Sequence, residues 1–211
     1  MAYAELDTLK EHIDKTTDGD DDVLEAILDA ATISIDRACN RYYPGATYFE
    51  ADPDATARQY RGSGKAYQRL DHCIAIALVE TRGSATADYT RYDDSDWLAY
   101  QGNYDRPIFD RTPYSAIMAT ADGSIGAFNS SRRGPTVRVT ARWGGYASPP
   151  ADIVEACIMQ SARWYKRLQS AMSDTMASGE LGMLLYQKSL DPDIRRILVD
   201  GRHVNSVVFG L

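Results

Sequence analysis

The chain has 211 residues, of which 44% are hydrophobic and 25% are charged, and this balance excludes an intrinsically disordered chain. The formal net charge of −7 gives no overall attraction to nucleic acid or to anionic membranes, and no apolar run is long enough to span a bilayer. The scattered cysteines, Cys39, Cys73 and Cys157, form neither a disulfide framework nor a CxxC metal site, so we expect buried thiols in a reducing cytoplasm.

Two helices are predicted before residue 46. Leu6, Leu9 and Ile13 mark one apolar face of a short first helix. A longer second helix follows an acidic turn, and Pro44 and Gly45 are expected to end it. Its apolar residues recur at spacings of three and four: Leu24, Ile27, Leu28, Ala31, Ile35, Ala38 and Tyr42.

The middle of the chain, residues 46–146, is predicted to form short antiparallel strands. "TYFEA" and "TARQYRG" flank a turn and favour a hairpin, and "CIAIALVE" (73–80) indicates a strand buried on both faces. "VRVTARW" alternates cleanly, which places four residues on one face: Val137, Val139, Ala141 and Trp143.

Residues 147–211 become helical again. A long helix is predicted from the apolar face Ile153, Ala156, Cys157, Trp164, Leu168 and Ala171. "DPDIRRILVD" predicts a short helix with Asp191 as N-cap and Pro192 at the first helical position. The predicted fold class is therefore α+β: a small helical bundle built from the N-terminal helix pair (1–45) and the C-terminal long and short helices (147–211), with an inserted antiparallel β subdomain (46–146).

The acidic stretch "DKTTDGDDDVLE" (14–25) raises the hypothesis of a calcium site. Asp14, Thr16, Asp18, Asp20, Asp22 and Glu25 fall on the oxygen-donor positions of an EF-hand loop, and Gly19 falls on its sharp turn. However, Asp21 takes the place of the usual aliphatic residue, and acidic residues before a helix also stabilise its N-terminus. We favour a solvated helix–helix connection, with a calcium-binding interaction module as the alternative function.

Other candidate sites are weaker. "RGSGKAY" (61–67) lacks the spacing of a phosphate-binding loop. "YDDSDW" clusters the carboxylates of Asp93, Asp94 and Asp96, which would suit a carbohydrate-handling domain, but no nucleophile or companion histidine stands at a recognisable spacing. We therefore expect no enzyme, no catalytic residue and no cofactor, and the carboxylates are interpreted as a surface loop.

The last eight residues, "VNSVVFGL" (204–211), have no charged side chain and no helical period. Such a segment either folds back onto its own core or adds as a strand to a partner's sheet edge. The candidate partner-binding residues are Val204, Val207, Val208, Phe209 and Leu211.

Several of these stretches together resemble one family, the head–tail connector (adaptor or head-completion) proteins of tailed bacteriophages. "VRVTARWGGYASPPADIVEACIMQSARWYKR" is similar to the family's strand, Trp turn, prolines and long Ala- and Arg-rich helix, although Ala141 stands where Gly is common. "SGELGMLLYQKSLDPDIRRIL" and "RPIFDRTPYSAI" resemble later and middle segments of the family, and the N-terminal helix pair with its acidic turn resembles its opening.

This resemblance implies a non-enzymatic virion protein of the neck, assembled in the host cytoplasm. Such proteins form a homo-oligomeric ring, typically dodecameric, beneath the portal protein. The ring extends the DNA channel without sequence-specific DNA binding and offers a platform for downstream neck or tail completion proteins; no membrane is involved. Because family members often grip the portal with a C-terminal segment, the resemblance assigns that role to Val204–Leu211.

Overall fold

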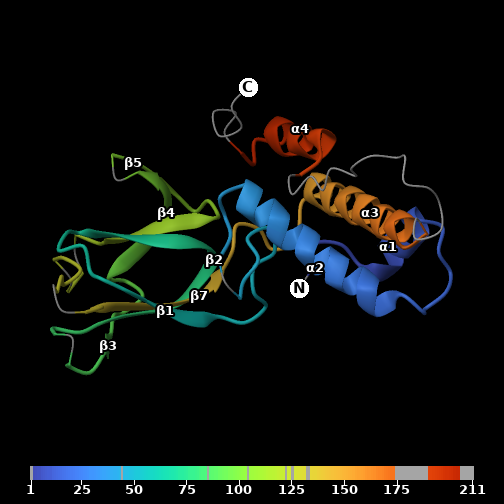
Figure 1. The fold of residues 1–211 in the computed structure, drawn as a ribbon. Helices are drawn as coiled ribbons and strands as arrows, with labels where there is room; N and C mark the ends of the chain where they lie inside the picture. The colour runs from blue at the N-terminus through green and yellow to red at the C-terminus, as the bar shows by residue number, and fades with distance from the viewer. Residues whose placement is uncertain are drawn as a thin grey trace. The chain divides into compact units, whose positions relative to one another are not determined.

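The computed structural model describes residues 2–43, 45–84, 86–103, 105–121, 123–124, 126–131, 134–173 and 190–204. The fold is mixed α and β, as predicted (Figure 1). Its described helices are α1 (Leu6–His12), α2 (Asp21–Ala38), α3 (Ala151–Ser173) and α4 (Pro192–Asp200). Its described strands are β1 (Thr56–Tyr60), β2 (Tyr67–Thr81), β3 (Thr90–Arg91), β4 (Trp97–Asn103), β5 (Arg106–Phe109), β6 (Tyr114–Ala119) and β7 (Val137–Trp143).

The chain divides into two compact units. The helical unit joins both ends of the chain, Met1–Thr47 and Pro149–Leu211, and the sheet unit comprises Tyr48–Ser148. The sheet unit begins and ends in paired backbone, since Gly145 N–H donates to the Tyr48 carbonyl over 2.7 Å and Ala51 N–H donates to the Tyr146 carbonyl over 2.8 Å.

The helical unit is held by apolar stripes on α2 and α3, which pack against each other. On α2, residues at helical spacing are buried: Leu24, Leu28, Ala31, Thr32, Ile35 and Asp36. They meet Ile153, Ala156 and Cys157 of α3, while Leu9 of α1 and Ile194 and Leu198 of α4 complete the core. Asp36 is buried as well, and its Oδ1 accepts the Tyr3 hydroxyl over 2.5 Å.

α2 is shorter at its C-terminal end than the sequence predicts. It ends at Ala38, and Asn40 adopts the left-handed conformation (φ 55°) that commonly terminates helices, several residues before Pro44. Tyr42, which was expected on the apolar face, is 42% exposed as a result.

The sheet unit is an antiparallel sheet with strand order β1–β7–β2–β6–β4–β5, and β3 pairs with the end of β2. β7 confirms its alternating pattern, because Val137, Val139, Ala141 and Trp143 are all buried. The expectation that residues 73–80 are buried on both faces is wrong: Ala75 and Ala77 are exposed. Register shifts between Cys73 and Ala75 and between Ile76 and Leu78 interrupt this part of β2, so neither face is continuously buried.

The predicted hairpin between residues 47–51 and 56–62 is also wrong. β1 pairs with β7, from Thr56 opposite Ala141 to Tyr60 opposite Val137, and residues 47–51 form no strand. The reason lies in Phe49, whose ring is buried and stacks on the ring of Tyr146 with a distance of 5.6 Å between the ring centroids. This contact holds residues 47–51 against the loop that follows β7.

The close approach of two loops in the sheet unit yields a prediction about stability. A Cβ atom on Gly62 would lie 1.8 Å from the backbone oxygen of Asn129. We expect Gly62→Ala to lower the free energy of unfolding by about 1–3 kcal/mol or more, because the backbone must move. Gly83→Ala, whose Cβ would meet no atom within 4 Å, should change it by less than about 0.5 kcal/mol. Urea denaturation measures both, and equal losses would contradict the packing described.

Candidate partner-binding surfaces

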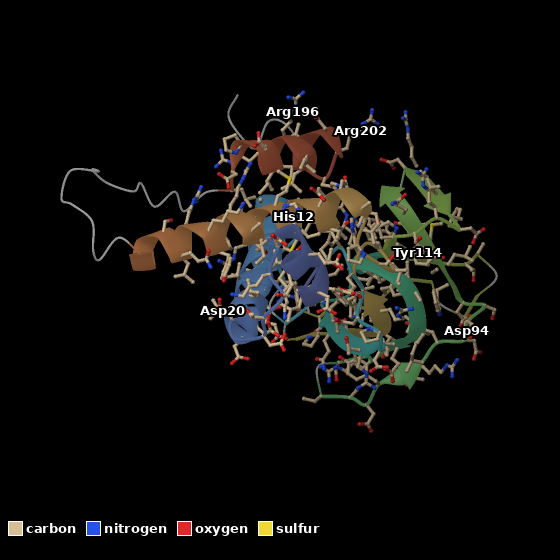
Figure 2. All side chains as sticks on the ribbon, turned by 90° about the vertical axis from the view of Figure 1, so that its right-hand side faces the viewer. His12, Asp20, Asp94, Tyr114, Arg196 and Arg202 are labelled. Atoms are coloured by element: carbon tan, nitrogen blue, oxygen red, sulfur yellow. The ribbon has the colours of Figure 1, made fainter. Side chains whose placement is uncertain are left out.

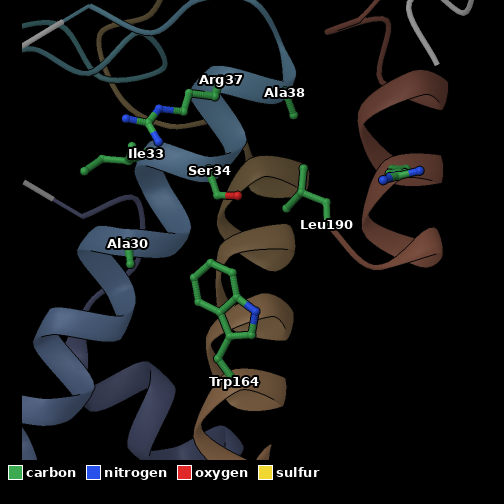
Figure 3. Close-up of a pocket in the computed structure, with 8 residues that line it drawn as sticks. Ala30, Ile33, Ser34, Arg37, Ala38, Trp164 and Leu190 are labelled. Carbon is green, nitrogen blue, oxygen red and sulfur yellow. The ribbon is translucent and has the colours of Figure 1, made fainter. Parts of the chain in front are cut away.

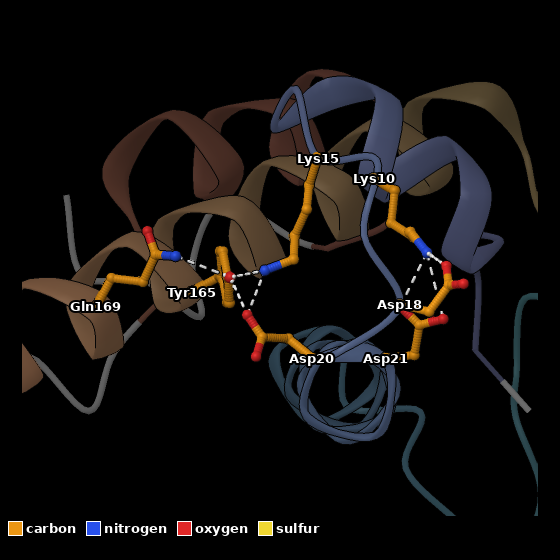
Figure 4. Close-up of polar contacts among 7 residues, drawn as sticks. All are labelled: Lys10, Lys15, Asp18, Asp20, Asp21, Tyr165 and Gln169. Atoms are coloured by element: carbon orange, nitrogen blue, oxygen red, sulfur yellow. Dashed lines mark hydrogen bonds and ion pairs between the residues drawn. The ribbon is translucent and has the colours of Figure 1, made fainter.

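Two lysines of the same unit pair with carboxylates of the acidic turn between α1 and α2 (Figure 4). Lys10 Nζ donates to Asp18 over 2.7 Å and to Asp21 over 2.9 Å. Lys15 pairs with Asp20 and donates to the Tyr165 hydroxyl over 2.7 Å. Lys15 and Asp20 therefore attach the turn to α3. In the EF-hand interpretation Asp20 was a calcium ligand and Lys15 a residue between two ligands.

The Tyr165 hydroxyl is the centre of this cluster, which we call the turn latch: Lys15, Asp20, Tyr165 and Gln169. The hydroxyl donates to Asp20 Oδ2 over 2.6 Å and accepts from Gln169 Nε2 over 2.8 Å (Figure 4). Hydrogen bonds from Lys15 and then Tyr165 lower the pKa of Asp20, and the bond to Asp20 raises the pKa of Lys15. Both groups are thus held in their charged forms.

The remaining candidate calcium ligands do not converge on a common point. Asp14, Asp22 and Glu25 are exposed, and Glu25 lies on α2 itself. Within the described part of the chain, no three His, Cys, Asp or Glu side chains are grouped so as to hold a metal ion. The described geometry supports the turn as a structural connection.

The carboxylates of the 93–96 loop also serve the fold. Asp96 is buried and accepts from the backbone N–H and the hydroxyl of Ser124, each over 2.8 Å. These bonds, with a further one from the Asp93 N–H, lower the pKa of Asp96. Asp94 is exposed and pairs with Arg91 at 3.3 Å. The loop carboxylates therefore fix a turn, which removes the main support for a carbohydrate site.

The α4 segment is anchored to α3 at both of its ends. At its start, Asp191 pairs with Arg163 at 3.3 Å and with Arg167 at 3.2 Å. At its end, Nε2 of His203 lies 2.7 Å from Oδ2 of Asp152 in the first turn of α3. Asp191 stands at the N-cap position before Pro192, as the sequence predicts.

The candidate tail follows this anchored helix. Val204, its first residue, is 8% exposed and therefore part of the helical unit's core. Val207, Val208, Phe209 and Leu211 lie outside the described residues. The segment that remains a candidate for docking on a partner thus starts at residue 205.

A groove in the helical unit borders α2, α3 and the segment that leads into α4 (Figure 3). Ala30 and Ile33 of α2, Trp164 of α3, and Leu190 form its apolar lining, and Arg37 and Arg195 add two cationic groups. Sequence periodicity assigned Trp164 to the core, but its indole is only half-buried. Periodicity could not reveal this groove, because it requires three segments from both ends of the chain.

The sheet unit has its own exposed apolar side chains. Leu98, Ile108 and Phe109 on β4 and β5 are 49%, 46% and 39% exposed. β5 is an edge strand, and its register places Phe109 opposite Tyr100, which is buried. Successive strand residues point to opposite faces, so Leu98 and Phe109 share the face of Tyr100 while Ile108 lies on the other face, and exposed apolar side chains occur on both faces at this end of the sheet.

Comparison with known proteins finds similarity at the level of structure alone. No family model and no curated protein matches the sequence. A chain from "Neck of empty GTA particle computed with C6 symmetry" is 14% identical with a TM-score of 0.52, over 92% of this chain and 88% of that chain. A chain from "Virion of native gene transfer agent (GTA) particle" is 14% identical with a TM-score of 0.53, over 99% of this chain and 93% of that chain.

These two similarities show a shared fold across nearly the whole chain. They agree with the resemblance to head–tail neck proteins that the sequence carries. Within the described part of the chain, no helix is both long and apolar enough to cross a membrane.

The turn latch gives a prediction about stability and pH. Tyr165→Phe removes one hydroxyl and its three hydrogen bonds, and we expect a loss of about 1 kcal/mol in the free energy of unfolding at neutral pH. The pKa of Asp20 is lower in the folded state than its usual value. The charged carboxylate therefore stabilises the fold above the usual carboxyl pKa, and this stabilisation is lost as the pH falls through the pKa of the folded state. The difference between the variant and the native chain should therefore shrink in acid, as urea titrations at several pH values will show.

The same geometry predicts the response to calcium. Because Lys10 and Lys15 already pair with Asp18 and Asp20, millimolar calcium should leave the melting temperature of the native chain and of Glu25→Gln unchanged. Magnesium at the same ionic strength is the control. A rise in Tm with calcium that Glu25→Gln abolishes would instead establish the EF-hand interpretation.

Proposed function

We propose that this chain is a structural neck protein of a tailed phage or phage-like particle. In this role it is a head–tail connector that forms a ring beneath the portal, extends the DNA channel and offers an attachment platform for neck or tail proteins. The observation that carries the proposal is the shared fold, over 99% of this chain, with a chain of the native GTA virion. The connector-like order of motifs in the sequence supports it independently.

The described polar groups support a structural role. The carboxylates that sequence analysis singled out are engaged in fastening turns and helices, as at Asp20, Asp96 and Asp191. The burial of Cys39 and Cys73 raises the pKa of each thiol to about 12, so these thiols are poor nucleophiles. What the surface offers is area for contact: a groove on the helical unit and an apolar sheet edge.

The charge balance suits a channel through which DNA moves. A protein that neutralises many phosphates releases counterions and binds DNA tightly. This chain has a net charge of −7, so its surface as a whole repels the phosphates. We propose that DNA passes through the ring without sequence-specific binding.

The two units take different tasks in this proposal. The helical unit forms the body of the ring, and the sheet unit, inserted between its two chain segments, presents strands and loops to neighbouring proteins. The tail from residue 205 onward docks on the portal, because α4 and the buried Val204 hold its starting point in place. An uncharged apolar segment gains most of its binding energy from burial against a partner.

This function is tested by binding to isolated portal rings. We expect the native chain to bind them, and deletion of residues 205–211 to weaken binding about tenfold or more while the melting temperature of the body stays unchanged. The deletion begins after Val204, because Val204 is buried and its removal would also disturb the core of the helical unit.

Point variants separate lost apolar contact from added charge. Phe209→Asp should reproduce most of the deletion's effect, whereas Asn205→Asp adds the same charge and should bind nearly as the native chain does. If the deletion variant and Phe209→Asp both bind portal rings as tightly as the native chain does, the tail has no docking role. If the native chain itself does not bind portal rings, the connector function is wrong.

A further inference from the structure

The net charge is distributed very unevenly along the chain. The sheet unit, residues 48–148, has twelve acidic and twelve basic residues and no net charge. Residues 149–211 have seven of each. The whole charge of −7 therefore belongs to residues 1–47, which hold eleven acidic and four basic residues.

α2 carries this asymmetry on its outward face. Opposite the buried stripe, one line of residues runs along the helix at spacings of three and four, Val23, Ala26, Ala30, Ile33 and Arg37, and Asp22 precedes it. Val23 and Ile33 on this face are 40% and 39% exposed. The face is thus acidic at its start, apolar in the middle and basic at its end.

The second half of that face is part of the groove. Ile33 and Arg37 line it together with Trp164, Leu190 and Arg195 (Figure 3). A binding partner that matches this lining presents aliphatic side chains beside carboxylates. The first half of α2 has that chemistry: Val23 and Ala26 are exposed beside Asp22 and Glu25, which make no ion pair within the described residues.

We propose that the groove binds the first half of α2 from a second copy of this chain. Val23 and Ala26 of one copy lie on the apolar lining of the other, and Asp22 and Glu25 approach Arg37 and Arg195. Both surfaces lie on the same face of α2, so two copies meet with their α2 helices antiparallel, and each groove then receives the acidic half of the other copy in a two-fold contact. This inference goes beyond the proposed function, because it names a contact between two copies that does not depend on the ring.

Charge selects a second copy over nucleic acid as the occupant. A phosphate backbone lying along the outward face of α2 would meet Asp22 and Glu25, within the segment that holds the entire net negative charge. The acidic start of α2 from a second copy meets the basic end of this face, at Arg37, and is attracted to it. Arg196 on α4 and Arg202 just after it project outward from the helix (Figure 2), so these two basic groups do not line the groove.

The test reverses one charge on each surface. Glu25→Arg and Arg37→Glu should each weaken self-association about tenfold or more in sedimentation velocity, because each places like charges together. An equal mixture of the two variants should restore association, since the arginine of one then meets the glutamate of the other. Glu11→Arg and Arg196→Glu, at exposed positions outside both surfaces, are the matched controls and should associate as the native chain does.

Disulfide trapping makes weak contacts measurable. A mixture of Val23→Cys and Ile33→Cys chains should cross-link under mild oxidation, whereas Val23→Cys mixed with Thr8→Cys on α1 should not. Absence of the Val23–Ile33 cross-link, or a charge-reversed mixture that behaves like the single variants, overturns the inference. Portal binding by the native chain is measured separately, so the connector function can survive that result.

Discussion

The packing of α2 against α3 is the constraint on which the helical unit depends. The two helices are separated by more than a hundred residues, yet neither can bury its apolar stripe without the other. Once Leu28 and Ile35 meet Ile153 and Cys157, both ends of the chain belong to one unit. The intervening residues must then leave and return at neighbouring points, which is where Tyr48 and Gly145 are hydrogen-bonded.

Polar side chains in this protein mainly hold elements at fixed positions. The Tyr165 hydroxyl fastens the α1–α2 turn to α3, and Asp191 fastens the start of α4 to the same helix through two arginines. Asp20 and Asp191 each have an opposite charge close by, so the cost of their partial burial is offset locally. A body stiffened in this way suits the proposed connector role, in which several neighbours would attach to one fixed shape.

The distribution of charge connects the fold to the proposed assembly. A neutral sheet unit and a strongly acidic N-terminal helix pair give the molecule two surfaces with different electrostatics. Electrostatic complementarity contributes more to the choice and orientation of a partner than to affinity. In the proposed contact between two copies, the pairing of the acidic start of α2 with a groove that holds two arginines would favour one orientation, and the apolar residues between them would supply the burial.

Local patterns in the sequence determined the helices, the alternating strand β7 and the Asp–Pro start of α4, because hydrophobic period and capping chemistry act over a few residues. They also raised the calcium question at residues 14–25, and they could not answer it, since the deciding partner, Tyr165, lies 145 residues beyond Asp20. The pairing of β1 with β7 and the groove around Trp164 likewise needed contacts between distant segments. Only the tertiary structure brings such segments together, and so it alone decided which acidic residues fasten the fold.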